Sequence, residues 1–328
     1  MRSEVRLRPF VVLSVAVVSA VLFAGCSGLG GGDETSSPTS TGSADLCGAA
    51  APAGPQSDAV TATGDVGTPP EVSFDFPIDA TELPTQRTVL VTGDGDELVA
   101  GDYLNFGYTI LDGTTGAVLD VGGFEPGQLM PQQISPDGLG AFFGCATIGS
   151  RIAVVAATGD TTTPSVVYVL DALGINPTAA WGEEQAPVAG MPTVTLDADG
   201  TPNITVPTDD TPPTETEIAV LKKGDGYTVA ASDQVLVQFR GARWSTGELF
   251  DGGDTWTGDS PYMGGADKFV PGFTKALVGQ TVGSQVLVVI PPADGYGEGE
   301  INTTDLKGDT LVFVIDILGA QQAVPAAQ

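Results

Sequence analysis

The chain contains no histidine, and this absence removes several kinds of active site. Ser-His-Asp triads and most histidine-ligated metal sites need an imidazole, so we expect neither. Basic residues are also scarce: 12 Lys and Arg stand against 41 Asp and Glu, a net charge of −29. Such a surface repels phosphate groups, so we expect no nucleic-acid partner. The acidity favours a well-solvated surface, and the carboxylates form neither a calcium loop nor the paired-acid motif of a hydrolase.

Cysteine is scarce too, and the first of the three cysteines ends a targeting segment. Three arginines stand among the first eight residues, a long apolar run follows, and small residues precede Cys26. This order is typical of an export signal, and the small residues resemble a bacterial lipobox, with Phe23 as the departure. We therefore expect residues 1–26 to be a lipoprotein signal peptide with Cys26 lipidated. The alternative is an uncleaved transmembrane anchor. Either arrangement holds the rest of the chain at the cell membrane, outside the cytoplasm.

The two remaining cysteines predict a disulfide. Residues 27–54 have the Gly, Ser and Thr content of a flexible tether, and they include Cys47. In an exported protein two leftover cysteines usually pair, so we predict a structural Cys47–Cys145 bond. Two unpaired buried thiols are the alternative.

The rest of the chain repeats itself. "VLVTGDGDELVAGD" (89–102) aligns with "VLKKGDGYTVAASD" (220–233) at an offset of 131 residues. "TIGSRIAVV" (147–155) aligns with "TVGSQVLVV" (281–289) at an offset of 134, and "SVVYVLDALG" (165–174) with "TLVFVIDILG" (310–319) at 145. The last step in offset is an eleven-residue insertion in the second copy, within the segment that holds "VVIPPADGYGEGE" (288–300).

The repeat predicts two copies of one small α+β domain. We place them at 55–176 and 188–320, with a Pro- and Gly-rich linker at 177–187 and a tail at 321–328. Runs such as "VLVQF", "SQVLVVI" and "TLVFVIDIL" have strand character. "PGFTKALVG" (271–279) instead predicts a short helix, because Phe273, Ala276 and Leu277 share one helical face between a proline and a glycine. One short helix beside one antiparallel sheet gives an α+β domain, used twice.

In the second copy, "VLVQFRG", "STGELFDGG", "KFVPGFTKALVGQTVGSQVLVVIPPADGYGEGE" and "GDTLVFVIDIL" together resemble the FKBP-type peptidyl-prolyl cis-trans isomerases. The resemblance covers about 90 residues in order. It implies two FKBP-like domains in tandem, the first degenerate. Each would be a bent antiparallel β-sheet wrapped around one short α-helix, with an apolar pocket between sheet and helix.

The resemblance also implies a set of site residues. The catalytic positions fall on Tyr296 in the loop over the pocket, Asp251, Phe239 and Phe313. The substrate-binding positions fall on Phe250, Phe269, Val270, Phe273, Tyr262, Ile301 and Leu306. Each phenylalanine alone could be an ordinary core residue, and Tyr296 could be a surface turn residue. At these spacings we interpret the set as a pocket.

The implied chemistry needs neither a cofactor nor a metal. An X–Pro amide rotates over a barrier near ~20 kcal/mol that amide resonance sets. An apolar aromatic pocket favours the twisted, less polar amide over the planar one, so the barrier falls without a nucleophile. In this interpretation the Tyr296 hydroxyl donates to a substrate carbonyl and Asp251 orients groups at the rim. Phe239 departs from the family pattern, which has a tyrosine there, and this departure could reduce activity.

The first copy lacks most of the site residues that the resemblance implies for the second copy. It has no counterpart of the tyrosine loop, and Ser135-Pro136 stand where the second copy has Phe269-Val270. We therefore expect a catalytically inactive first domain. The leading hypothesis is a monomeric, membrane-tethered, extracytoplasmic isomerase that assists the folding of proline-containing exported proteins. The alternative is a non-catalytic lipoprotein of the same fold that binds proline-containing segments or a protein partner.

Overall fold

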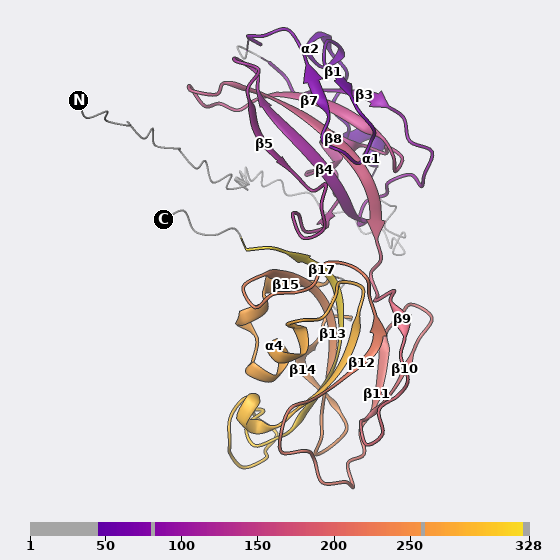
Figure 1. Ribbon diagram of the computed structural model, residues 1–328. Helices are drawn as coiled ribbons and strands as arrows, with labels where there is room; N and C mark the ends of the chain where they lie inside the picture. Colours follow the sequence, from indigo (N-terminus) through magenta and orange to yellow (C-terminus); the bar gives the residue numbers. More distant parts are fainter. Residues whose placement is uncertain (1–44, 80–82, 257–259, 324–328) are drawn as a thin grey trace, which may run out of the picture. The chain divides into compact units, whose positions relative to one another are not determined.

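The computed structural model describes residues 45–79, 83–256 and 260–323 (Figure 1). The predicted signal peptide, Cys26 and most of the predicted tether lie outside these residues. Among the described helices, none is both long and apolar enough to cross a membrane. We call residues 45–176 the first half and residues 177–323 the second half.

The first half contains one six-stranded antiparallel sheet with short helices and a small hairpin. The sheet has the order β3-β7-β8-β4-β5, and β6 pairs with β4. Its strands are β3 (Gln86–Val91), β4 (Tyr103–Asp112), β5 (Val118–Gly122), β6 (Gln132–Gln133), β7 (Arg151–Ala157) and β8 (Ser165–Asn176). The other elements are α1 (Leu46–Ala49), α2 (Pro55–Asp58), the hairpin of β1 (Thr61–Thr63) and β2 (Glu71–Ser73), and α3 (Gly140–Phe143).

The second half contains a seven-stranded antiparallel sheet. Its order is β14-β13-β17-β16-β12-β9, and β15 pairs with β13. The strands are β9 (Glu183–Glu184), β12 (Glu217–Lys223), β13 (Gln234–Arg243), β14 (Leu249–Asp254), β15 (Tyr262–Gly265), β16 (Gln285–Ile290) and β17 (Leu311–Gln321). The other elements are the hairpin of β10 (Thr193–Leu196) and β11 (Pro202–Thr205), the 3-10 turns η1 (Ala266–Lys268) and η2 (Pro292–Asp294), and α4 (Pro271–Leu277).

The two sheets share one topology. Strands β3 to β8 pair with one another as β12 to β17 do, in the same order along the chain. Register shifts fall at equivalent positions: Val89/Val91 corresponds to Val220/Lys222, and Asn105/Phe106 to Leu236/Val237. Such bulges bend a strand and increase its twist, so the sequence repeat corresponds to a repeated bend in the sheet.

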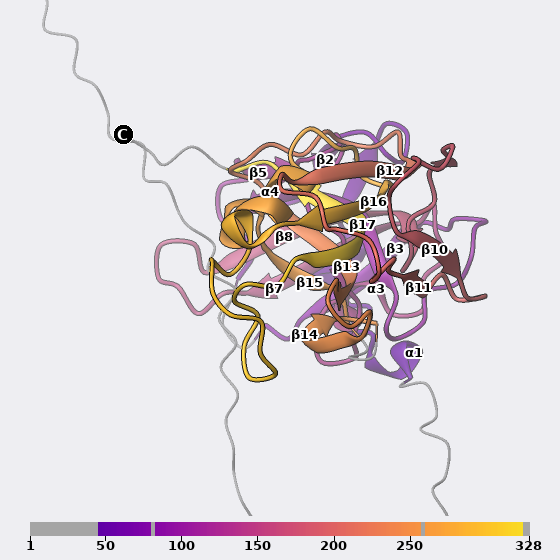
Figure 2. The same cartoon turned by 90° about the horizontal axis from the view of Figure 1, so that it is seen from below.

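Helix α4 follows from local sequence. Pro271 lacks the N–H that a first helical turn leaves unpaired, and Gly279 adopts φ 84° just beyond the last turn. Phe273, Ala276 and Leu277 are buried against the sheet, as predicted. Gly272 brings the helix close to β16 (Figure 2), because a Cβ at that position would lie 2.4 Å from Ile290 Cγ2.

The second sheet is covered on both faces, which the sequence did not indicate. Alternate residues of β16 divide between two apolar clusters: Val286, Val288 and Ile290 face α4, whereas Leu287 and Val289 face the other side. Val194 of β10 and Ile204 of β11 pack on that second cluster. In the first half, Ala62 of β1 and Val72 of β2 similarly pack on one face of the first sheet. A hairpin that precedes the first long strand therefore covers one face in each half.

Two segments that were predicted to connect domains contain secondary structure. The expected tether at 27–54 contains helix α1, where the Asp45 side chain accepts a hydrogen bond from Gly48 N at 2.9 Å. The expected linker at 177–187 contains β9, which pairs with β12. Both segments have the composition of connecting chain. The disulfide of Cys47 nevertheless holds part of the first segment in place, and backbone pairing with β12 holds part of the second.

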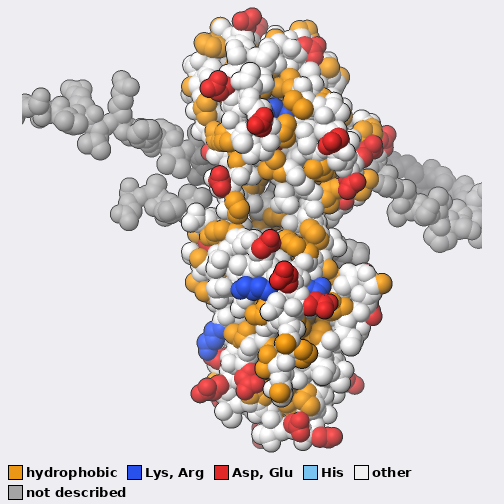
Figure 3. All heavy atoms as spheres, turned by 45° about the vertical axis from the view of Figure 1, so that its right-hand side comes forward, with side chains coloured by type: hydrophobic (Ala, Val, Ile, Leu, Met, Phe, Trp, Pro, Cys, Tyr) orange, Lys and Arg blue, Asp and Glu red, His pale blue; other side chains and the backbone are white. Residues whose placement is uncertain are grey.

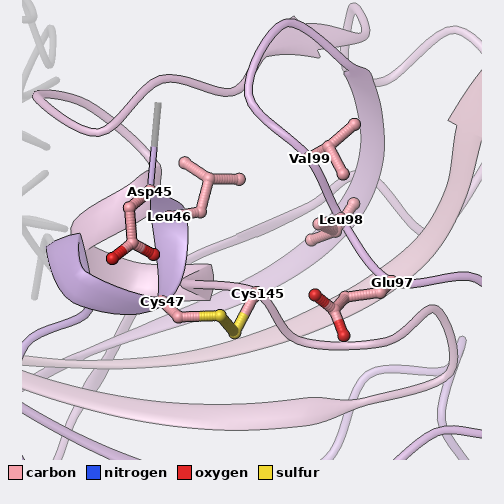
Figure 4. Close-up of a pocket in the computed structure, with 7 residues that line it drawn as sticks. All are labelled: Asp45, Leu46, Cys47, Glu97, Leu98, Val99 and Cys145. Atoms are coloured by element: carbon pink, nitrogen blue, oxygen red, sulfur yellow. A yellow bond between two sulfur atoms is a disulfide. The ribbon is translucent and has the colours of Figure 1, made fainter. Parts of the chain in front are cut away.

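Cys47 of α1 and Cys145 form a disulfide with Cα atoms 4.8 Å apart, which is the pairing expected from the sequence. It joins residues 98 positions apart and holds α1 beside the end of α3 (Figure 4). A cavity of about 240 Å³ lies next to it, lined also by Asp45, Leu46, Glu97, Leu98 and Val99. Because the two sulfur atoms are bonded to each other, they offer no thiolate to a metal ion beside the Glu97 carboxylate.

Candidate functional site

Six aromatic side chains of the second half form one connected cluster around Phe239 of β13. Its ring centroid lies 5.4 Å from that of Phe273, 6.1 Å from Phe313 and 6.5 Å from Phe269, all with edge-to-face geometry. Edge-to-face contacts place a positive ring edge against a negative ring face, which fixes the rings relative to one another. The cluster is therefore a preformed apolar surface.

The outer members of the cluster form a rim that solvent reaches. Phe269 stacks on Phe273 at 4.3 Å, Tyr262 lies 5.2 Å from Phe269, and Phe250 lies 5.5 Å from Phe313. Phe239, Phe273 and Phe313 are buried, Phe250 and Phe269 are half-buried, and Tyr262 is 42% exposed. This gradient from buried floor to open rim suits a surface that accepts an apolar ring from outside.

Strand register explains how distant residues meet here. Gly241 of β13 pairs with Phe313 of β17, which places Phe313 next to Phe239 on the same face. Gly241 also leaves room for the rings, since a Cβ there would lie 2.6 Å from Phe313 and 2.8 Å from Phe250. Thr255 fixes the backbone of Phe239 by accepting from its N–H at 2.9 Å and donating to its carbonyl at 2.9 Å.

The remaining substrate-binding candidates lie around this cluster. Val270 caps the N-terminus of α4, and Val270 and Leu306 pack against the core that contains the aromatic residues. Ile301 and Leu306 line a groove of about 460 Å³ together with Phe250 and Leu249. Phe250 belongs to both the groove and the aromatic cluster, so the groove that Ile301 and Leu306 line adjoins the cluster.

Arg243 holds the groove in shape. Its guanidinium donates to the carbonyl oxygens of Asn302 at 3.0 Å and Asp305 at 2.8 Å, and it lies 3.4 Å from Asp309 Oδ2. Asp309 also accepts from the Ser245 hydroxyl at 2.5 Å. These bonds join the turn after β13 to the loop before β17, which makes the groove a fixed feature.

Tyr296 lies in the loop after β16 and is 49% exposed. Within the described residues its hydroxyl has no hydrogen-bond partner, so it can donate to a bound peptide. No ring contact joins Tyr296 to the aromatic cluster in that same part of the chain. The backbone of Asp251 belongs to β14, but its side chain lies outside what the structure describes.

The equivalent region of the first half differs in its contents. The Tyr108 hydroxyl donates to Asp120 Oδ2 at 3.1 Å, and burial together with the Asp120 charge raises the pKa of Tyr108 to about 12. Phe142 contacts Tyr168 at 5.5 Å, and residues 158–164 connect β7 directly to β8. The first half thus keeps the tyrosine–aspartate pair but has no loop like the one that carries Tyr296.

Three contributors were not singled out from the sequence: Gly241, Arg243 and Thr255. Gly241 carried a signal, because it ends the "VLVQFRG" segment that supports the family resemblance. The other two carried none, because each acts through a partner on a different segment. Arg243, for example, bonds to residues 59 and 62 positions further along the chain.

Comparison with known proteins agrees with this site. Residues 226–318 match the family model described as FKBP-type peptidyl-prolyl cis-trans isomerase. The chain is 32% identical over 110 residues to the FK506-binding protein of Streptomyces anulatus, and the match covers 33% of this chain and 87% of that protein. It is 29% identical over 127 residues to FK506-binding protein 2B of Rhizopus delemar, covering 36% and 61% of the two chains.

The crystal structure of FkpA from Escherichia coli is also similar, with 25% identity over 40% of this chain and 53% of that one and a TM-score of 0.30. The Streptomyces match includes most of a whole protein, and the family model covers every residue of the aromatic cluster. The chain therefore belongs to the FKBP-type peptidyl-prolyl cis-trans isomerase family.

Proposed function

We propose that the second half, as an FKBP-like domain, catalyses cis–trans isomerisation of X–Pro bonds in exported polypeptides. The observation that carries this proposal is the aromatic cluster around Phe239, with a buried floor and an accessible rim. A prolyl ring on this surface leaves water together with its amide. The twisted amide loses resonance and charge separation, so an apolar surface stabilises it relative to the planar ground state.

The groove and Tyr296 orient the bound peptide. The Tyr296 hydroxyl, free of protein partners within the described residues, donates to a carbonyl of the bound peptide. Chain that flanks the proline lies in the groove along Ile301 and Leu306, next to Phe250. Holding the flanking peptide in a bent conformation reduces the rotational freedom that the reaction must otherwise remove.

We also propose that the first half is an FKBP-like domain without isomerase activity. Its sheet has the same strand order as the second sheet, which supports a shared origin. The direct β7–β8 connection and Leu139, which aligns with Phe273, leave it without the loop and the floor of the site. It would serve as a spacer, a stabilising partner or a binding module.

We further propose that lipidated Cys26 tethers the chain at the cell membrane, outside the cytoplasm. The targeting segment and the disulfide support this location, since disulfides persist in oxidising compartments. The wild-type chain should incorporate a labelled fatty acid, and Cys26→Ala should abolish that labelling. An unlabelled wild-type chain would contradict the lipid anchor.

A proline-limited refolding assay with the full chain tests the activity. We expect acceleration by the wild-type chain, and a loss of about ten-fold or more in Phe313→Ala, because the buried floor of the site collapses. Tyr168→Ala, at the aligned position in the first half, should leave the rate unchanged. A wild-type chain that binds proline-containing peptide without accelerating refolding would favour the alternative of a binding lipoprotein, which the missing hydroxyl of Phe239 also favours.

A further inference from the structure

Three separate segments of the second half meet at the carboxylate of Asp294. Lys275 of α4 places Nζ 2.6 Å from Asp294 Oδ2, and the Thr216 hydroxyl donates to the same oxygen at 2.5 Å. Asp294 ends the turn η2, and Thr216 directly precedes β12. We call this group of Asp294, Lys275 and Thr216 the loop clasp.

The loop clasp is charged under ordinary conditions. The hydrogen bonds from Lys275 and Thr216 hold the pKa of Asp294 below its usual value. The side chain of Lys275 is 54% exposed and that of Asp294 is 25% exposed. Ion pairs that are this exposed to solvent contribute little to global stability. The main effect of the clasp is therefore on the conformation of the segment that it holds.

That segment is the one that carries Tyr296. Asp294 N donates to Pro291 O at 3.0 Å, and Gly297 N donates to Pro292 O at 2.8 Å, which folds the chain back after β16. Gly297 O in turn accepts from Gly308 N at 2.9 Å. Tyr296 thus stands between two fixed points, the Asp294 side chain on one side and the Gly297 backbone on the other.

The clasp also connects this loop to the aromatic cluster. Lys275 lies on α4 two residues after Phe273, whose ring contacts Phe239, Phe269 and Phe313. A bond from Lys275 to Asp294 therefore fixes the tyrosine loop relative to the helix that forms the floor of the site. The first half has neither the loop nor a lysine at the position aligned with Lys275, which is Ala141.

We propose that Asp294 is a positioning residue: through Lys275 and Thr216 it holds the Tyr296 hydroxyl where it can donate to the peptide bound on the aromatic cluster. This inference rests on the proposed function for the role of Tyr296. Without the clasp, the loop samples more conformations while the sheet and α4 stay folded. Fewer bound complexes then have the hydroxyl in place.

A double-mutant cycle in the full chain tests the inference. Asp294→Asn keeps the shape of the side chain but removes its charge, and we expect kcat/KM in a proline-limited assay to fall by about three- to ten-fold. Tyr296→Phe should also lower kcat/KM. In the Tyr296→Phe background, Asp294→Asn should lower kcat/KM hardly any further, because Asp294 acts by positioning the hydroxyl that Tyr296→Phe has already removed.

Lysine variants supply the matched controls. Lys275→Met should reproduce the loss and Lys275→Arg should restore most of it, because a guanidinium can still donate to Asp294. Lys268→Met removes the same charge from the neighbouring turn η1, where Lys268 pairs with exposed Asp267 at 3.0 Å. That variant should keep wild-type activity, since Asp267 is not part of the tyrosine loop.

Amide hydrogen exchange of residues 294–297 provides a readout that does not depend on activity. We expect faster exchange in Asp294→Asn with an unchanged urea midpoint. An unchanged kcat/KM in Asp294→Asn, or an undiminished loss in the Tyr296→Phe background, would overturn the positioning role. If the wild-type chain shows no isomerase activity, the proposed function is wrong, and the exchange rates alone then decide whether Asp294 fixes the loop.

Discussion

The Tyr108 hydroxyl donates to the Asp120 carboxylate at 3.1 Å, whereas the aligned strand position in the second half is Phe239, which cannot donate. The half that has the aromatic cluster around Phe239 therefore lacks the hydroxyl, whereas in the other half Tyr108 contacts a single ring, that of Phe106 at 6.4 Å. A tyrosine hydroxyl at this strand position and the six-membered aromatic cluster therefore occur in different copies.

Restoring the hydroxyl tests whether this separation limits activity. We expect Phe239→Tyr to raise kcat/KM by about two- to five-fold in a proline-limited assay, because it restores the hydroxyl that Tyr108 presents to Asp120 at the aligned position of the first half. Phe239→Leu, which removes the ring edges without adding a hydroxyl, should lower kcat/KM. Equal activity in Phe239→Tyr and wild type would show that the missing hydroxyl is not limiting.

A pair of glycine substitutions tests the packing of the aromatic cluster. Gly241→Ala places a methyl group 2.6 Å from Phe313 and 2.8 Å from Phe250, so the rings must move apart. We expect a loss of about 1–3 kcal/mol in the free energy of unfolding, together with lower kcat/KM. Gly174→Ala is the matched control, because no atom lies within 4 Å of its added Cβ. Comparable losses in both variants would contradict a role specific to the cluster.

Removing the disulfide should destabilise the fold without changing the candidate site. Cys47 and Cys145 close a loop across 98 positions, and a cross-link of this length contributes about 3–5 kcal/mol by limiting the unfolded chain. Cys47→Ser/Cys145→Ser should lower the free energy of unfolding by a corresponding amount, measured by urea unfolding. Dithiothreitol should reproduce the shift in the wild-type chain and have no effect on the double variant. Isomerase activity should stay unchanged, and a parallel loss of activity would place the site elsewhere.

Some parts of the fold and of the candidate site could be predicted from the sequence, and others could not. Strands and helix α4 were predictable, because apolar periodicity and the Pro271 and Gly279 positions are local signals. The aromatic set was predictable only through the family resemblance, since nothing in the spacing of Phe250 and Phe313 alone indicates contact. Side-chain bonds across many residues, such as Thr216 to Asp294, depend on the folded geometry and leave no local pattern.

The aligned aspartates Asp171 and Asp316 illustrate the same limit. Both end up buried on the last strand, and each accepts from the backbone of the segment that precedes its sheet: Asp171 from Gly67 N at 2.8 Å and Asp316 from Ala180 N at 2.7 Å. Their second partners differ, because Arg151 forms an ion pair with Asp171 whereas neutral Gln285 donates to Asp316 at 2.8 Å. The repeat predicts where these two carboxylates lie, but it does not predict that only Asp171 has a basic residue as an ion-pair partner.

That difference predicts a pH dependence of stability. Burial raises the pKa of Asp316 above its ordinary value of 3.8, and the bonds from Ala180 and Gln285 and the positive charge of Lys222 offset this only in part. The folded chain therefore holds its proton more tightly than the unfolded chain. As pH rises from about 4 through the folded pKa, unfolding releases a proton, so the free energy of unfolding falls across this window and is level above it. At neutral pH the ionised carboxylate destabilises the fold, and Ala180, Gln285 and the charge of Lys222 reduce that effect.

Asp316→Asn removes the titration while keeping one acceptor oxygen, so it isolates this effect. Urea unfolding of both chains between about pH 3.5 and 7 should show that the wild type loses stability relative to Asp316→Asn as pH rises. The substitution also changes hydrogen bonds, but their effect on the free energy of unfolding does not depend on pH. It therefore does not alter the slope of the free-energy difference between the two chains against pH. Parallel curves for the two chains would mean that Asp316 keeps an ordinary pKa in the folded state. A wild-type chain that instead loses stability relative to Asp316→Asn as pH falls would mean that the fold stabilises the ionised carboxylate, as a buried ion pair does.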